Sequence, residues 1–247
     1  AKIAINTFVC AKISQANILA GLCERIPGAD VDIVTQAVGS DSRVGRKAFT
    51  GGLGYGGPCY PKDVRSFAAL LEGMGLPASF FEAVHAGNES AGAHLADCVL
   101  QLADELHAGA VGLFGVAFKP GSSSVANSSG VALAKRLLGQ SRRVILHDPL
   151  ALDAAREIFG GRLRYVRDVR ECFDACGVAV FVNADPCYRA LTRDWFESHP
   201  GPLAVVDCWR MYRFLENAKS IRYRPIGLYQ APRETPAELE NRKVHSQ

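Results

Sequence analysis

The chain has 247 residues, of which 48% are hydrophobic and 21% charged, and its formal net charge is +3. At about 150 residues per domain, this length predicts one or two domains with enough apolar side chains for sizeable cores. The composition excludes a disordered or collagen-like chain, and no stretch concentrates Lys and Arg strongly enough for nucleic-acid binding.

The cysteines and apolar runs indicate a reducing compartment. No window holds the roughly 18 uninterrupted apolar residues of a membrane helix, and no signal-peptide pattern opens the chain. Eight cysteines occur without a Cys-x-x-Cys pair, and the histidines form no ligand array with them. We therefore expect a cytoplasmic protein with reduced thiols, no metal and no membrane partner. Because Ala1 opens directly on a helical pattern without a capping residue, we expect the chain to be part of a longer protein.

Up to residue 108, the apolar residues recur at helical spacing. Helices are predicted over residues 1–24, over 31–38 with Asp30 as N-cap, over about 62–74 and over 78–107. The last helix carries a heptad-like stripe made of Phe81, Val84, Asn88, Ala91, Leu95, Cys98 and Leu102. Spacing alone leaves open whether this stripe packs on its own domain or against a second subunit.

From residue 109 on, short β-rich runs alternate with helical runs. Strands are predicted at 110–118, 143–146, 162–166, 178–182 and 203–206, and helices at 129–138, 151–159, 168–175 and 194–198. This alternation predicts an α/β fold with a doubly wound parallel sheet. We expect an all-helical domain over 1–108, a Rossmann-like domain over 109–232 and a polar tail over 233–247. Ligands of such sheets bind beyond the carboxyl ends of the strands, where Phe118 and residues 207–210 fall.

Five glycines lie within residues 51–57, just before Cys59. Glycine at this density is expected where the backbone needs positive φ or approaches a ligand closely, with a flexible surface loop as the alternative. Cys59 stands at the entrance of a predicted helix, next to Lys62. A helix N-terminus and a cation both favour the thiolate, so Cys59 is the best nucleophile candidate. Asp63 suits either a helix cap or an acid-base role.

Lys2 and Asn6 are four residues apart and share one face of the first predicted helix. A cation and an amide facing a pocket can stabilise an oxyanion or position a water molecule. Spacing alone nevertheless favours a solvated Lys2 and an incidental Asn6. Gly112 and Gly115 form an incomplete dinucleotide fingerprint, which is weak evidence for nucleotide binding.

Several motifs together resemble one known family. They are Lys2-x-x-x-Asn6, Lys12-Ile-Ser14 with Asn17, Asp41-x-Arg43-x-Gly45, the run from Gly54 to Asp63, the run from Gly115 to Gly121, and Asp148-Pro149. In this order they resemble the UDP-glucose/GDP-mannose dehydrogenases, most closely the UDP-glucose 6-dehydrogenase branch, with GDP-mannose and UDP-N-acetylhexosamine enzymes as alternatives. Members of this family oxidise the C6 alcohol of a nucleotide sugar to a carboxylate in two hydride transfers to NAD, through a cysteine thiohemiacetal and thioester.

The resemblance implies a role for each matching residue. Cys59 is the nucleophile, Lys2 and Asn6 stabilise oxyanions and position water, and Asp63 assists proton transfer and thioester hydrolysis. The substrate pocket is lined by Gly54, Tyr55, Gly56, Gly57, Tyr60, Phe118, Lys119 and Arg210, and Lys62 is assigned to the NAD cofactor. Arg43 reaches into a neighbouring subunit, which implies a homodimer formed through the helix at 78–107.

The sequence departs from the family pattern in three places. The family's NAD-binding domain with its G-x-G-x-x-G motif does not precede these motifs, so we expect the chain alone neither to hold NAD well nor to turn over. In the run 122–128, Ala126 stands where the family has the Arg of an Arg-Glu-Ser motif. Pro58 removes a backbone N–H just before Cys59. A non-catalytic nucleotide-sugar-binding paralogue is therefore the second hypothesis.

Overall fold

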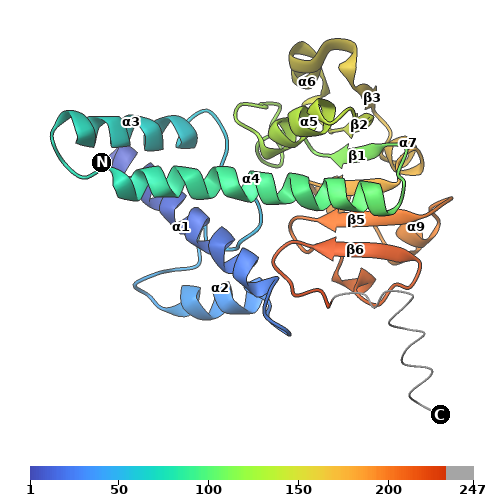
Figure 1. Cartoon of the computed structure of the whole chain (residues 1–247), viewed down its shortest axis with the longest axis horizontal. Coiled ribbons are helices and arrows are strands. Elements are labelled where there is room, and N and C mark those ends of the chain that lie inside the picture. Colours follow the sequence, from blue (N-terminus) through green and yellow to red (C-terminus); the bar gives the residue numbers. More distant parts are fainter. Residues whose placement is uncertain (232–247) are drawn as a thin grey trace.

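The computed structural model describes residues 1–231, and the polar tail predicted over 233–247 lies outside the described residues. The chain begins with the helices α1 (Lys2–Cys23), α2 (Val31–Ser40), α3 (Tyr60–Gly73) and α4 (Ser79–Glu105). All four predicted helices are thus confirmed. Asp30 caps α2 as predicted, because its carboxylate accepts a hydrogen bond from the Asp32 N–H at 2.8 Å. The long helix α4 runs across the whole molecule (Figure 1).

Part of the apolar stripe of α4 is buried within its own chain. At the first half of the helix, Val84 packs in a small cluster with Cys10 and Tyr55. At the second half, Leu95 and Leu102 belong to the core that α4 forms with the sheet. Packing within the chain therefore accounts for part of the stripe, and a homodimer formed through the helix at 78–107 stays a prediction.

Six strands form one parallel sheet. They are β1 (Val111–Phe114), β2 (Val144–His147), β3 (Arg164–Val166), β4 (Val178–Phe181), β5 (Leu203–Asp207) and β6 (Ile221–Pro225). Their order is β3-β2-β1-β4-β5-β6, and every neighbouring pair is parallel. This confirms the predicted α/β fold with a doubly wound sheet. The sequence analysis missed β6, whose alternating pattern Ile-Arg-Tyr-Arg is the period of a half-buried edge strand.

Helices cover both faces of the sheet. They are α5 (Ser129–Gly139), α6 (Leu152–Phe159), α7 (Val169–Asp174), α8 (Pro186–Arg189) and α9 (Arg193–Glu197). Neighbouring residues of one strand point to opposite faces, so Leu113 packs in the core with α4 and α5, whereas Phe114 stacks on Phe181 in an aromatic core. The strands β1, β2, β4 and β5 are buried along their whole length, which explains their continuous apolar runs.

The chain returns from β6 to the helical part. The Val31 N–H donates to the Gly227 carbonyl at 3.1 Å, and the Tyr229 N–H donates to the Ala29 carbonyl at 3.2 Å. The Glu24 carboxylate at the end of α1 accepts a hydrogen bond from the Gly227 N–H at 2.8 Å. The two predicted parts are therefore joined by backbone hydrogen bonds as well as by α4.

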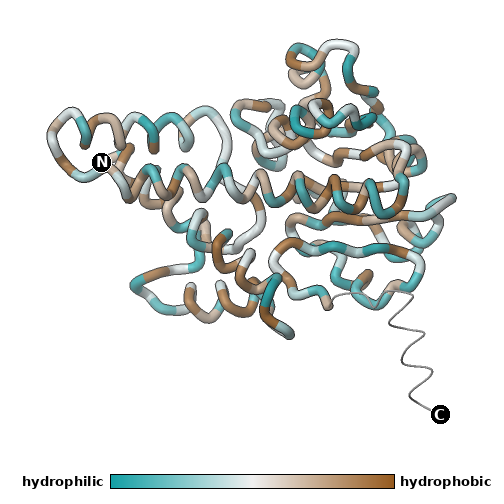
Figure 2. The backbone as a smooth tube through the Cα atoms, in the orientation of Figure 1, coloured by the Kyte–Doolittle hydropathy of each residue, from teal (hydrophilic) through white to brown (hydrophobic). Residues whose placement is uncertain are grey.

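One helix of the described part, α1, is long and apolar enough by length and composition to cross a membrane. It is not an uninterrupted apolar run, because polar residues such as Asn6, Lys12 and Gln15 lie between its apolar ones. A core helix of a globular protein passes the same test, and α1 buries Cys10 and Ala20 within the chain. Its other face exposes Phe8, Ile18 and Leu22, and α1 contains hydrophobic segments along its length (brown in Figure 2).

Candidate active site

A cavity of about 480 Å³ lies between the helical part and the edge of the sheet. This volume is within the range of small-molecule sites. Its walls come from α1, from the loop before α3, from the segment after β1 and from the ends of β4 and β5. The lining residues are Ile13, Asn17, Ala48, Thr50, Gly51, Leu53, Gly54, Tyr55, Gly56, Gly57, Pro58, Cys59, Tyr60, Ala117, Phe118, Lys119, Ser129, Val182 and Trp209. Gly54 to Gly57, Cys59, Tyr60, Phe118 and Lys119 were all predicted as site residues.

The sheet contributes its carboxyl edge at the point where the strand order reverses, between β1 and β4. Doubly wound sheets bind ligands at this switch point. The Asp148 carboxylate accepts hydrogen bonds from the N–H groups of Val116 and Ala117 at 2.7 and 3.0 Å, and so holds the start of the segment that carries Phe118. The Lys119 Nζ lies 5.6 Å from the centre of the Phe118 ring and supplies a cation at the cavity wall.

The glycines of the loop are required by close approach, as predicted, although the approach is to protein. Gly57 has φ +84°, and a Cβ there would lie 2.8 Å from the Phe118 ring. A Cβ on Gly56 would lie 2.4 Å from the Asn127 carbonyl oxygen. Only glycine therefore allows the loop to pack against the segment after β1.

Asn88 anchors the middle of the loop to α4. Its side chain accepts a hydrogen bond from the Tyr55 N–H at 2.7 Å and donates one to the Tyr55 carbonyl at 3.2 Å. The Tyr55 ring packs edge-on against Tyr60, with ring centres 6.4 Å apart. Burial raises the pKa of Tyr55 well above its usual range, so the phenol stays protonated. The sequence placed Asn88 in the apolar stripe and missed this role.

Cys59 is an exposed thiol at the wall of the cavity. It is the N-cap residue of α3, and its carbonyl accepts a hydrogen bond from the Asp63 N–H at 2.8 Å. Cys10 provides a contrast within the same region, because burial, and secondarily Asp63, raises the pKa of the Cys10 thiol to about 12. Exposure at a cavity and a place at a helix N-terminus are the features expected of a nucleophilic cysteine.

Asn6 and Asp63 meet one helical turn from Cys59. The Asn6 Nδ2 donates to the Asp63 carboxylate at 2.6 Å across 57 positions of sequence. Asp63 is buried, whereas Lys2 is exposed one turn before Asn6 on α1. Lys62 is also exposed on α3. The structure thus brings Asn6 and Asp63 together, while Lys2 and Lys62 point to solvent.

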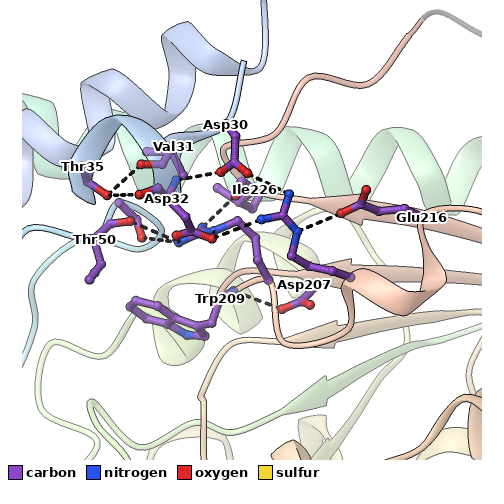
Figure 3. Close-up of polar contacts among 12 residues, drawn as sticks. Asp30, Val31, Asp32, Thr35, Thr50, Asp207, Trp209, Glu216 and Ile226 are labelled. Atoms are coloured by element: carbon purple, nitrogen blue, oxygen red, sulfur yellow. Dashed lines mark hydrogen bonds and ion pairs between the residues drawn. The ribbon is translucent and has the colours of Figure 1, made fainter. Parts of the chain in front are cut away.

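Arg210 is placed differently from its expected role as a substrate-binding residue. Its guanidinium is bidentate to the Asp32 carboxylate, with Nε and Nη2 at 2.9 and 2.8 Å, and the side chain is only 3% exposed. It also donates to the carbonyls of Thr50, Gly51 and Ile226 (Figure 3). These bonds occupy the guanidinium, so Arg210 joins the sheet to α2 and to the start of the glycine loop.

Arg43, a predicted site residue, has an exposed side chain. Its side chain is 87% exposed and pairs with Asp41 at 2.6 Å, outside the cavity lining of its own chain. Lys12 on α1 holds the loop behind it, donating to the carbonyls of Val44, Gly45 and Lys47 at 2.9, 3.0 and 2.7 Å. The loop that carries Arg43 is therefore fixed, while the guanidinium faces outward.

Among the cavity-wall residues that were not predicted as site residues, Trp209 and Asn17 make side-chain hydrogen bonds at the wall. The Trp209 indole N–H donates to the Val182 carbonyl at 2.9 Å, which lays the ring along the cavity. The Asn17 side chain donates to the Leu53 carbonyl at 3.1 Å, and its own oxygen is buried without a hydrogen-bond partner. An aromatic residue directly after a buried strand is the sequence signal that points to Trp209.

The fold and the cavity define a doubly wound α/β protein with an exposed cysteine at its candidate site. The family model described as "UDP-glucose/GDP-mannose dehydrogenase family, central domain" matches residues 1–90. The model described as "UDP-glucose/GDP-mannose dehydrogenase family, UDP binding domain" matches residues 112–214. The chain therefore belongs to the UDP-glucose/GDP-mannose dehydrogenase family, which confirms the resemblance seen in its motifs.

Individual relatives agree with this assignment. The chain is 36% identical over 178 residues to UDP-glucose 6-dehydrogenase TuaD of Bacillus subtilis, covering 71% of this chain and 38% of TuaD. It is 31% identical over 228 residues to the UDP-glucose 6-dehydrogenase of Rhizobium meliloti, covering 92% and 52% of the two chains. A UDP-glucose dehydrogenase structure from Pyrobaculum islandicum superposes with a TM-score of 0.79 at 35% identity, covering 92% of this chain and 50% of that one. The chain thus spans about half the length of these relatives, or less.

Proposed function

We propose that the chain is the part of an NAD-dependent UDP-glucose 6-dehydrogenase that binds the nucleotide sugar and carries the nucleophile, in an enzyme that converts UDP-glucose to UDP-glucuronate. The observation that supports this most directly is the cavity that unites Cys59 with Phe118 and Lys119. A sugar nucleotide bound along the sheet edge places its anionic phosphates near the Lys119 ammonium and its sugar towards the glycine loop. UDP-glucose is favoured over the GDP-mannose and UDP-N-acetylhexosamine alternatives by the named relatives.

The incomplete dinucleotide fingerprint at Gly112 and Gly115 is packed against protein. A Cβ on Gly112 would lie 2.7 Å from the Cys176 sulfur, and one on Gly115 would lie 2.2 Å from the Asn183 Cβ. These glycines are thus packed inside the domain. In the proposed reaction NAD accepts the two hydrides. This role of NAD is inferred from family membership.

Cys59 acts in the middle of the proposed reaction. Its thiolate adds to the C6 aldehyde, which forms a C–S bond and an alkoxide. Loss of a hydride from that carbon leaves a thioester, and attack by water then breaks the C–S bond, giving the carboxylate and releasing the thiol. Asp63 lies one turn away and is held by Asn6, so it suits the removal of the proton from that water. Lys2, exposed on the same helix, is assigned to the oxyanion.

We also propose that two copies of the chain assemble. Arg43 is exposed and faces away from its own cavity, as expected of a residue that completes a neighbouring site. The apolar surface available for such an assembly lies on α1, where Phe8, Ile18 and Leu22 are 63%, 65% and 50% exposed. Sedimentation of the Phe8→Ser and wild-type chains tests this proposal, because the variant is expected to shift towards the monomer.

Two measurements test the enzymatic proposal. Titration calorimetry of the 247-residue chain is expected to show binding of UDP and UDP-glucose but not of GDP. A fusion that places the NAD-binding domain of a relative before Ala1 is expected to reduce NAD with UDP-glucose, and Cys59→Ser is expected to abolish turnover while leaving UDP binding intact. A fusion that binds NAD and UDP-glucose yet reduces NAD with no nucleotide sugar would instead support a non-catalytic binding protein.

A further inference from the structure

The loop that leads to Cys59 is held at Gly57 by the segment between β1 and α5. The Gly57 N–H donates to the Ala126 carbonyl at 2.9 Å. In return, the Asn127 Nδ2 donates to the Gly57 carbonyl at 3.1 Å across 70 positions of sequence. Both polar groups of the Gly57 backbone are therefore bonded to two successive residues of the sheet domain.

The position of this contact matters because of the residue that follows. The Gly57 carbonyl belongs to the peptide group that joins Gly57 to Pro58, and the Pro58 ring fixes its own φ near about −65°. The two backbone torsions between that peptide plane and Cys59 are φ and ψ of Pro58, and φ is already restricted by the ring. Holding the Gly57 carbonyl therefore limits where the Cys59 thiol can lie at the cavity wall.

The contact is kept despite an unfavourable backbone conformation. Asn127 has φ +46°, in the left-handed region that residues with a side chain rarely adopt, although Asn tolerates it best. The next residue, Ser128, is buried and fixes the segment: its hydroxyl donates to the Val116 carbonyl and caps α5. A Cβ on Gly56 would collide with the Asn127 carbonyl oxygen, so glycine at position 56 leaves room for this carbonyl. The strain at Asn127 is thus maintained by specific neighbours on both sides.

This contact joins the two short segments in which the sequence departs from its family pattern. Asn127 stands at the Glu position of the family's Arg-Glu-Ser motif, next to Ala126 at the Arg position. Pro58 is the other local departure. The structure places the Asn127 amide on the carbonyl of the peptide group that precedes Pro58. The Asn127 amide and the Pro58 ring therefore act on the two sides of the same peptide group.

We propose that Asn127 is a positioning residue for Cys59, which it acts on by holding the Gly57 carbonyl with its side-chain amide. The proposal rests on the proposed function only in taking Cys59 as the nucleophile. Asn127 donates through its side chain, so the backbone strain and the amide contact can be separated by substitution. Asn127→Gly relieves the strain and removes the donor, whereas Asn127→Asp keeps the shape and replaces the donor with a carboxylate oxygen that repels the Gly57 carbonyl.

The test compares these two variants with wild type in the 247-residue chain. Hydrogen exchange of the Gly57, Cys59 and Tyr60 amides is expected to be about 2- to 10-fold faster in both variants, the range for loss of one hydrogen bond. Alkylation of Cys59, measured relative to the exposed thiol of Cys187, is expected to rise by a similar factor because the released loop opens. The thermal midpoint of Asn127→Gly is expected to equal or exceed that of wild type, since the strain is gone.

Ser141→Gly is the matched control. Ser141 also has a left-handed φ of +56°, but it follows the far end of α5. This control is expected to raise the thermal midpoint without changing exchange or Cys59 alkylation. The proposal would be overturned if both Asn127 variants had the same hydrogen-exchange and Cys59 alkylation rates as wild type. It would also be overturned if these rates rose only in proportion to a fall in the thermal midpoint. Neither readout requires a ligand, so failure to bind UDP would count against the proposed function and leave this inference standing.

Discussion

Arg210→Ala is expected to destabilise the junction between the sheet and the helical part. The guanidinium is 3% exposed and has five hydrogen bonds, two to Asp32 and three to backbone carbonyls. Breaking a buried ion pair by removing one partner costs about 3–5 kcal/mol. Asp32 is 42% exposed, so water can solvate the remaining carboxylate, and we expect a loss of about 2–4 kcal/mol in the free energy of unfolding.

Urea titration followed by circular dichroism measures this loss, with Arg213→Ala as the matched control. Arg213 bonds to Asp30 and Glu216 in the same cluster but is 44% exposed; its removal leaves the nearly buried Asp30 carboxylate with the Asp32 N–H as donor, and is expected to cost about 1–2 kcal/mol. Arg210→Lys keeps the charge but not the bidentate geometry, and is expected to fall between wild type and Arg210→Ala. Equal losses for Arg210→Ala and Arg213→Ala would refute the conclusion that Arg210 is the buried link of this junction.

Three further outcomes follow from the structure. Gly57→Ala places a methyl group against Phe118 at positive φ and is expected to cost about 1–3 kcal/mol, whereas Gly73→Ala, at an open helical position, is expected to stabilise by about 0.5–1 kcal/mol; thermal unfolding compares the two. Hydrogen bonds with Cys98 and Glu24 raise the pKa of His94 from 6.5 to about 10. The stabilisation that His94 adds relative to His94→Gln is therefore expected to be complete below pH 6.5 and to disappear as the pH rises through 10. A constant difference in urea midpoint across that range would contradict this expectation. Brief alkylation is expected to label the exposed thiol at 59 first, to label Cys187 slowly because burial and Asp185 raise its pKa to about 12, and to spare the six buried thiols, which peptide mass spectrometry can check.

Local pattern was sufficient for most of the elements and for the position of Cys59 at a helix N-terminus. Helical periodicity predicted α1 to α4, and apolar runs predicted five of the six strands. The dense glycines before Cys59 predicted positive φ or a close approach to a ligand; in the structure Gly57 has positive φ and approaches the Phe118 ring. The edge strand β6 was missed because its polar alternate residues make its hydrophobic signal weak.

Long-range partners were beyond the sequence analysis. The α4 stripe has the same spacing whether it faces its own chain or another, and only the tertiary structure shows that Leu95 and Leu102 pack in the core with the sheet. Arg210 matched a motif position, yet its side chain bonds to Asp32, which is 178 positions away. Motif matching locates a residue in the chain but does not determine which of several acceptors its guanidinium reaches.

The sequence by itself determined the family, the α/β architecture and the residues of the candidate site, because each of these depends on local spacing and residue type. The tertiary structure decided which of those residues share one cavity, which of them hold the two parts together, and that Asn127 contacts the loop of Cys59. These contacts join segments tens of residues apart, and they depend on how the helical part and the sheet pack against each other.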